Sequence, residues 1–200
     1  MKIVFYFICF QLLFCFSVNA QNRRSLLRKN EKQKFSKVIK TLKKGFKKNP
    51  ENIILFDVKA HLFINSNYKK FDTKTAYLSA NKVDSLLRSN NLDEKVLKTL
   101  LKEEIDTYYS QDLIDSISYI AFQRDFEIDE VNRYNEHLTF YTSESEWITK
   151  EVISSRNAKA YKNAVSENTV VSFQNFIDTY PDATELYDAI KNKCATHMKL

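Results

Sequence analysis

An internal repeat of 39 residues is the feature that most constrains how this chain can fold. Reading forward from Ala121 and from Ala160, residues of the same physical class recur in the same order without a gap. The matched apolar residues are Leu113, Ile114, Ala121, Phe122, Phe126, Val131, Tyr134, Leu138 and Tyr141 in one copy and Val152, Ile153, Ala160, Tyr161, Val165, Val170, Phe173, Ile177 and Tyr180 in the other. Such a period is typical of stacked helix pairs, because one pair alone cannot bury its apolar face.

The register of the repeat extends beyond these apolar positions. Asp129 matches Asn168, so polar residues that can start a helix keep the same spacing. The pair Trp147–Ile148 matches Tyr108–Tyr109 one period earlier and Leu186–Tyr187 one period later. The sequence therefore predicts a partial third copy that stops mid-unit near its last residues.

Composition indicates the fold class. The 200 residues include one glycine and two prolines, whereas tight strand hairpins need residues that tolerate positive φ. The sequence therefore predicts an all-α fold of antiparallel helix pairs, stacked as a short α-solenoid. Expected helices lie at 34–48, 51–64, 72–89, 93–108, 112–126, 130–140, 145–165, 169–179 and 183–198. An alternative makes strands of 138–142 and 169–173, which are rich in β-branched and aromatic residues.

Charge is segregated along the chain. Residues 21–48 hold twelve Lys or Arg and one acid, a net charge of +11, whereas residues 49–200 carry a net charge of −6. Apolar residues recur at helical spacing within the basic segment, namely Phe35, Val38, Ile39, Leu42 and Phe46. This pattern predicts a cationic amphipathic helix, which can lie on an anionic membrane or dock on an acidic partner. The alternative is a solvated outer face of the first helix in the array.

The first twenty residues have the pattern of a secretory signal. Lys2 precedes an apolar run over residues 3–16, and small residues follow up to Ala20. We expect cleavage after Ala20 and export to the periplasm, the outer membrane or the medium. The alternative is an uncleaved membrane anchor, because most of the nearby basic residues follow the apolar run, against the usual charge bias. Residues 21–200 are then expected to form a single helical repeat domain.

Two stretches resemble tetratricopeptide-type helical repeats. The first has the turn Asn49-Pro50-Glu51-Asn52, with Val38, Leu42 and Gly45 before it and Phe56, Ala60 and Phe63 after it. The second, with Ala160, Tyr161, Asn168, Thr169, Phe173, Phe176, Ile177, Tyr180, Pro181, Asp182 and Ala183, is similar to the divergent repeats of exported bacterial proteins. The resemblance implies a first repeat over 49–107, longer repeats over 108–200, a packing role for Gly45, and binding of a protein or peptide without catalysis.

The sequence lacks the motifs of common catalytic sites. It has no glycine-rich phosphate loop, no Gly-x-Ser-x-Gly and no His-Glu-x-x-His. We therefore expect no enzyme activity, no cofactor and no metal. Cys194 and His197 would share a helix face, but two ligands do not make a metal site. We expect Cys194 to be a buried thiol, since the repeat places an apolar residue there, and His61 to be a satisfied core or edge residue.

These observations predict an exported helical-repeat scaffold that binds a protein or peptide in the cell envelope. The alternative is a peripheral binder of an anionic membrane or surface polymer; export argues against nucleic acid as a partner. Tyr68 and Phe71 lie in the expected loop at 65–72, where no helical period explains them as core. An apolar patch is expected near Leu186, Ile190 and Cys194. Candidate partner-binding residues are Lys37, Lys40, Lys44, Lys47, Tyr68, Phe71, Leu186 and Ile190.

Overall fold

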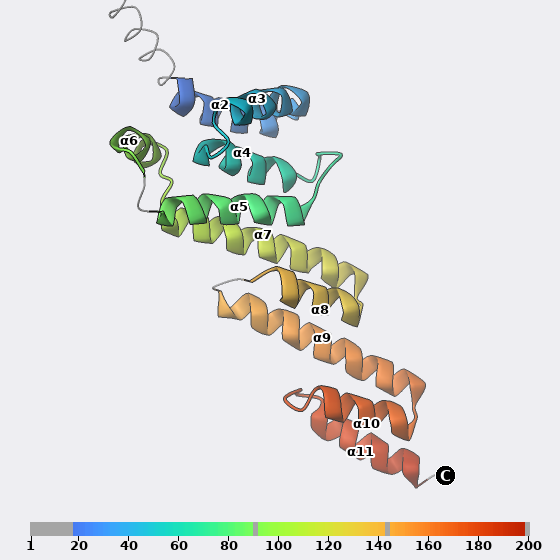
Figure 1. Ribbon diagram of the computed structural model, residues 1–200. Helices are drawn as coiled ribbons and strands as arrows, with labels where there is room; N and C mark the ends of the chain where they lie inside the picture. Colours follow the sequence, from blue (N-terminus) through green and yellow to red (C-terminus); the bar gives the residue numbers. More distant parts are fainter. Residues whose placement is uncertain (1–17, 90–91, 143–144, 199–200) are drawn as a thin grey trace, which may run out of the picture. The chain divides into compact units, whose positions relative to one another are not determined.

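The computed structural model describes residues 18–89, 92–142 and 145–198, with side chains from Arg23 onward. Every regular element in these ranges is a helix, and none is a strand, which confirms the all-α prediction (Figure 1). The helices are α2 (Val18–Glu31), α3 (Phe35–Lys48), α4 (Ile53–Phe63), α5 (Thr73–Arg88), α6 (Glu94–Lys102), α7 (Thr107–Ile128), α8 (Val131–Phe140), α9 (Glu146–Glu167), α10 (Val170–Thr179) and α11 (Leu186–His197). The alternative strands instead fall at the end of α8 and the start of α10.

Short polar side chains begin several of these helices. Asn52 accepts a hydrogen bond from the Leu55 backbone N–H (3.1 Å), and Asp93 accepts one from Val96 (2.8 Å). Before α10 the Thr169 hydroxyl and the Ser172 side chain form a reciprocal capping box. Each cap satisfies backbone donors that have no partner inside the helix.

The helices of the second copy start and end 39 residues after those of the first. Both α7 and α9 contain 22 residues, and both α8 and α10 contain 10, with matching ends one period apart. The matched residues Asp129 and Asn168, just after α7 and α9, have φ of 52° and 48°. The expectation that these two residues start helices is therefore wrong: they end α7 and α9 in the left-handed conformation, and the N-caps of α8 and α10 are the next residues, Glu130 and Thr169.

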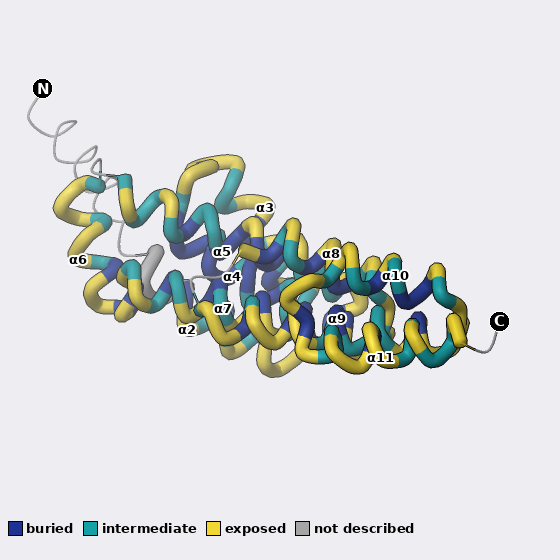
Figure 2. The backbone as a smooth tube through the Cα atoms, turned by 90° about the horizontal axis from the view of Figure 1, so that it is seen from below, coloured by how far each residue is buried: buried dark blue, intermediate teal, exposed yellow. Residues whose placement is uncertain are grey.

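The chain packs as two compact units, one ending at Ile117 and the other starting at Ser118, so that the boundary falls within α7. In the first unit α4 packs antiparallel to α5 and against α2 and α3. In the second, α9 packs against α8 and α10, and α10 against α11. Buried residues run along the inward side of most helices in each unit (Figure 2).

The core of the first unit explains its glycine. Leu26, Val38, Leu42, Leu55, Val58, Leu62 and Tyr68 form one buried cluster. A Cβ atom at Gly45 would collide with the end of the Leu55 side chain, so a larger residue there would force Leu55 to shift in the packed space between α3 and α4. This supports the packing role that the tetratricopeptide-like resemblance implies for Gly45.

The helix expected over 93–108 is wrong in one respect, because the structure divides it. α6 ends at Lys102, Glu104 has a φ of 56°, and the Ile105 N–H donates to the Leu100 carbonyl across the turn (3.0 Å). Asp106 then caps α7 through the Tyr109 N–H (2.8 Å). The interruption turns part of the expected apolar stripe outward, so that Leu101 and Tyr108 are about four-fifths exposed (77% and 82%).

The register of the third copy is also corrected. α11 begins at Leu186, forty residues after α9 begins, and its buried residue is Ala189. Tyr187, which the repeat matches to the buried Ile148, is 77% exposed. The strict period therefore holds for two copies and shifts in α11.

Most of the predicted signal segment, residues 1–17, lies outside the described residues, and its last three residues begin α2. Among the described helices, none is long and apolar enough to span a bilayer. The basic helix expected over residues 21–48 is divided by a turn at 32–34 into α2 and α3.

Candidate functional site

The four candidate lysines of α3 lie on one exposed face of the helix. Lys37, Lys40, Lys44 and Lys47 are spaced three and four residues apart, which places them on neighbouring turns of one side. All four are exposed, and no side chain among the described residues forms an ion pair with them. The opposite face of α3 is buried through Val38 and Leu42. The helix thus presents mainly its charged side to solvent, while its other apolar residues are partly buried against the first unit.

The two aromatic candidates in the loop are not equivalent. Tyr68 is only 8% exposed and packs edge-on against Phe63, with its ring centroid 5.5 Å away, and against Phe35 at 5.2 Å. The interpretation that core packing does not explain Tyr68 is therefore wrong. Phe71 is half-buried. The loop folds back so that Tyr68 enters the core. Its position in the sequence, outside any helical period, does not reveal this burial.

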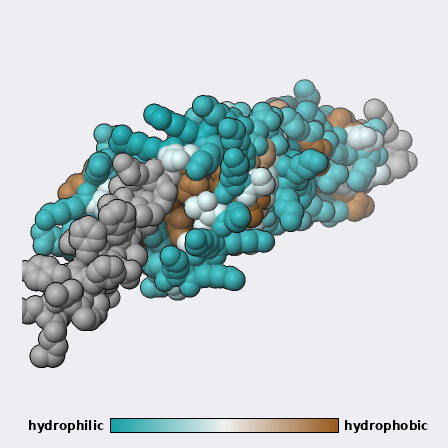
Figure 3. Space-filling view, turned by 90° about the horizontal axis from the view of Figure 1, so that it is seen from above, coloured by the Kyte–Doolittle hydropathy of each residue, from teal (hydrophilic) through white to brown (hydrophobic). Residues whose placement is uncertain are grey.

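The structure places the candidates of α11 on a partly exposed apolar stripe. Ile190 is 44% exposed and Leu186 is half-buried. Tyr187, Cys194 and Met198 are exposed on the same side of the helix. The expectation of a buried Cys194 thiol is therefore wrong, because no helix of the described chain covers this part of α11. Figure 3 shows exposed apolar side chains as brown patches among hydrophilic ones.

A buried polar cluster in the first unit was not expected from the sequence. The Arg23 guanidinium of α2 donates to the Asp57 carboxylate of α4 (Nε to Oδ2, 2.8 Å) and to the Tyr109 hydroxyl (2.8 Å). The Tyr109 hydroxyl also donates to Asp57, and His61 Nε2 lies 2.9 Å from that hydroxyl. Asp57 is fully buried. We call Arg23, Asp57, His61 and Tyr109, together with Glu103, the buried polar cluster.

The cluster ties four helices together. Arg23 also donates to the Glu103 backbone carbonyl (3.3 Å), and its Nη1 lies 3.7 Å from the Glu103 carboxylate. Arg24 lies 3.5 Å from the same carboxylate. Since α2, α4, the end of α6 and the start of α7 all contribute, the cluster fixes where the basic α2 lies in this unit. The sequence held one signal of this cluster. Asp57 is the only carboxylate in the largely apolar α4, and a buried charge needs a partner.

The environment of the cluster shifts several pKa values. Burial works against the charge of Arg23, but the hydrogen bond and attraction of Asp57 outweigh it and raise the pKa of the guanidinium. Burial lowers the pKa of His61, although Asp57 partly opposes this shift. Burial, followed by the neighbouring Asp57, raises the pKa of the Tyr109 hydroxyl. At neutral pH the cluster therefore holds one buried Arg–Asp ion pair, a neutral His61 and a neutral Tyr109.

A serine, a histidine and an aspartate meet inside the second unit. His137 Nδ1 lies 3.1 Å from Asp125 Oδ2, and His137 Nε2 lies 3.4 Å from the Ser118 hydroxyl. The order resembles a nucleophile–base–acid arrangement, but Ser118 is fully buried and His137 is 1% exposed. A nucleophile must reach its substrate. The geometry instead supports a structural role, in which Asp125 and Ser118 satisfy a buried imidazole between α7 and α8.

The remaining candidate chemistry is sparse. Among the described residues, no group of three or more His, Cys, Asp or Glu side chains is placed to hold a metal ion. No family model, curated protein or solved structure matches this chain. The tetratricopeptide-like resemblance therefore stays a prediction. The function has to be inferred from the residues exposed on the described helices.

Proposed function

We propose that this protein is an exported, non-catalytic scaffold of stacked helix pairs that binds a protein partner in the cell envelope through an acidic segment of that partner. The observation that carries the proposal is the exposed face of α3, where Lys37, Lys40, Lys44 and Lys47 have no acidic partner among the described side chains. Unpaired like charges on one helix face attract a complementary surface and raise the rate of association.

The way α3 is packed favours a protein partner over a membrane. An interfacial helix binds lipid by inserting an apolar face beneath the headgroups. In this structure Val38 and Leu42 on the apolar side are already buried against the first unit. Only electrostatic adsorption to lipid remains available to α3, whereas an acidic protein segment needs no inserted apolar face.

The test compares the wild-type protein with a variant in which Lys37, Lys40, Lys44 and Lys47 are all changed to Gln. The matched control changes four exposed lysines elsewhere, Lys69, Lys70, Lys162 and Lys191, to Gln, so that both variants lose the same charge. The probes are a labelled Glu-rich peptide, its Gln-containing counterpart, and vesicles of phosphatidylcholine with or without phosphatidylserine. Fluorescence anisotropy and co-sedimentation report binding at low and at high ionic strength.

We expect the wild type to bind the Glu-rich peptide at low salt and the α3 variant to bind at least about tenfold more weakly, since exposed charge pairs contribute about 0.2–1 kcal/mol each. The control variant should bind like the wild type. No binding of the acidic peptide at low salt, or an equal loss in the control, would refute the proposal. Binding to phosphatidylserine vesicles alone would favour the membrane alternative.

A further inference from the structure

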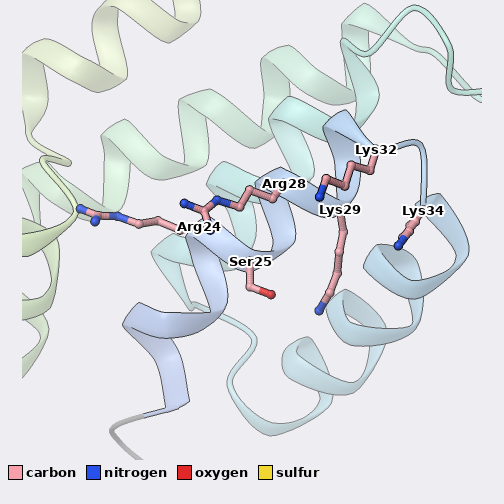
Figure 4. A pocket seen from close by; sticks show the side chains of 6 residues that line it. All are labelled: Arg24, Ser25, Arg28, Lys29, Lys32 and Lys34. Carbon is pink, nitrogen blue, oxygen red and sulfur yellow. The ribbon is translucent and has the colours of Figure 1, made fainter.

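A hollow of about 360 Å³ lies beside the C-terminal half of α2, at the turn into α3 (Figure 4). It is lined by Arg24, Ser25, Arg28, Lys29, Lys32 and Lys34. Five of these six residues are cationic, and none of them belongs to the lysine face of α3 described above. We call this feature the α2 hollow.

Four of the five cations have no acidic partner within the described chain. Arg24 is the exception, because it lies 3.5 Å from the buried Glu103 carboxylate and donates to the Lys102 carbonyl (3.3 Å). No ion pair joins Arg28, Lys29, Lys32 or Lys34 to any described acid, including the nearby Glu31. The field of these four charges is therefore directed to solvent.

Capping of α2 does not account for these charges. The last carbonyls of α2 already accept backbone N–H groups, from Lys32 to Arg28 (3.1 Å), from Gln33 to Asn30 (2.9 Å) and from Lys34 to Lys29 (2.7 Å). Gln33 adopts a φ of 54° to make this closed turn. Arg28 and Lys29 still complement the helix dipole. Lys32 and Lys34 lie beyond the end of the helix, and neither makes a described side-chain contact.

The shape of the hollow indicates what kind of anion fits it. In Figure 4 the cationic side chains spread outward, with Arg28 extending along α2, Lys29 toward α3, and Lys32 and Lys34 over the turn. They do not converge on one point, as they would around a single compact anion such as phosphate. The walls are mostly apolar, as expected where methylene stems of Lys and Arg form them. A ligand that fits such walls carries several separated negative charges with aliphatic groups between them.

We infer that the α2 hollow is a binding site for an acidic polypeptide segment in which carboxylate side chains alternate with aliphatic ones. Carboxylates bind the tips of Arg28, Lys29, Lys32 and Lys34, and an aliphatic side chain lies against the methylene stems. The Ser25 hydroxyl supplies a neutral donor on the same wall. The inference rests on the proposed function and identifies a second contact for the same partner, separate from α3.

Two buried hydrogen-bonding residues hold the wall of the α2 hollow against α4. Arg23, one residue before Arg24, is held by Asp57 and Tyr109, and Asn30 of α2 donates to the His61 carbonyl (3.0 Å). α2 is thus held at Arg23, just before the hollow, and at Asn30, within the stretch that lines it, so that less ordering entropy is lost when a ligand binds.

The experiment uses a labelled peptide of alternating Glu and Leu, its Gln–Leu counterpart and inorganic polyphosphate as probes. The hollow variant changes Arg28, Lys29, Lys32 and Lys34 to Gln. The α3 variant and the lysine control described above serve as comparisons. All three leave the core unchanged, and circular dichroism and thermal unfolding verify the fold. Carbodiimide coupling of peptide carboxylates to lysine amines, followed by mass spectrometry, locates the peptide.

We expect the wild type to prefer Glu–Leu over Gln–Leu peptide, the hollow variant to bind at least about tenfold more weakly, and cross-links to form at Lys29, Lys32 or Lys34. Unchanged binding by the hollow variant, or cross-links confined to other lysines, would overturn the inference; a loss in the α3 variant alone would then leave the proposed function standing. Failure of the wild type to bind any acidic peptide would overturn both. Hollow-dependent binding of polyphosphate without peptide binding would overturn the ligand class.

Discussion

Asp57 is the residue on which the packing of α2 most depends. Changing Asp57 to Asn keeps the size of the side chain but removes the closest counter-charge of the buried Arg23 guanidinium, which keeps only the more distant Glu103 carboxylate at 3.7 Å. Breaking a buried ion pair in this way costs about 3–5 kcal/mol. We therefore expect a loss of that size in the free energy of unfolding, measured by urea denaturation. An exposed acid, Asp112, serves as the control for the same chemical change.

The Asp112→Asn control should change stability by less than about 0.5 kcal/mol. If Asp57→Asn is no more destabilising than this control, the buried polar cluster does not hold α2 in place. A measurable loss of helix content would accompany the expected result, since α2 would detach from α4.

His61 gives the first unit a dependence on pH. Because burial lowers the pKa of His61 below its usual 6.5, the folded protein binds a proton at this site less readily than the unfolded chain. The contribution of His61 to stability is therefore complete above about pH 6.5 and is lost as pH falls from there through the lower pKa of the folded protein. We expect His61→Gln to reduce the decline in unfolding free energy between about pH 7.5 and about pH 5. Parallel stability curves for the two proteins would contradict this.

At the scale of elements, the left-handed residues after α7 and α9 offer a matched comparison. Asn168 has a φ of 48°, and its side chain accepts only a long hydrogen bond from Thr196 (3.3 Å). Asp129 has a φ of 52°, but its carboxylate also accepts hydrogen bonds from Lys159 (3.0 Å) and Tyr134 (3.3 Å). The hydrogen bond from Lys159 is the main reason that the pKa of Asp129 is lowered.

Glycine adopts this conformation without strain, so Asn168→Gly should be neutral or stabilising, within about 0.5 kcal/mol. Asp129→Gly should destabilise by about 1 kcal/mol because two side-chain contacts are lost. Thermal and chemical denaturation of the two variants measure the difference. Equal effects at both positions would show that the contacts of Asp129 contribute nothing to stability.

The elements also show how far periodicity predicts structure. The helices α7 to α10 start and end where the repeat predicts. The reason is that local hydrogen bonds, caps and an apolar stripe define a helix, and these local features recur with the sequence. The break at 103–106 was not predicted. At this break Glu103 contacts Arg23 and Arg24, which lie about eighty residues earlier in the sequence, and no local pattern records such a contact.

At the scale of the whole molecule, the two compact units predict regional stability. The buried polar cluster lies in the unit that ends at Ile117, whereas Val152 is fully buried in the core of the other. We expect Asp57→Asn to increase amide hydrogen exchange in α4 and α5 more than in α9 and α10, and Val152→Ala to do the reverse. If either variant increases hydrogen exchange equally in both units, the two units unfold cooperatively, as expected for a single domain over residues 21–200.

The sequence alone determined the helical class, most helix ends, the repeat in two copies and the exposure of the α3 lysines, because each follows from spacing along one helix. Tertiary structure decided which polar and aromatic residues are buried. Arg23 and Tyr68 enter the core, whereas Cys194 stays exposed. Burial depends on which distant segment covers a residue. A charged side chain such as Arg23 is stable in the core only because another helix places a partner, Asp57, beside it.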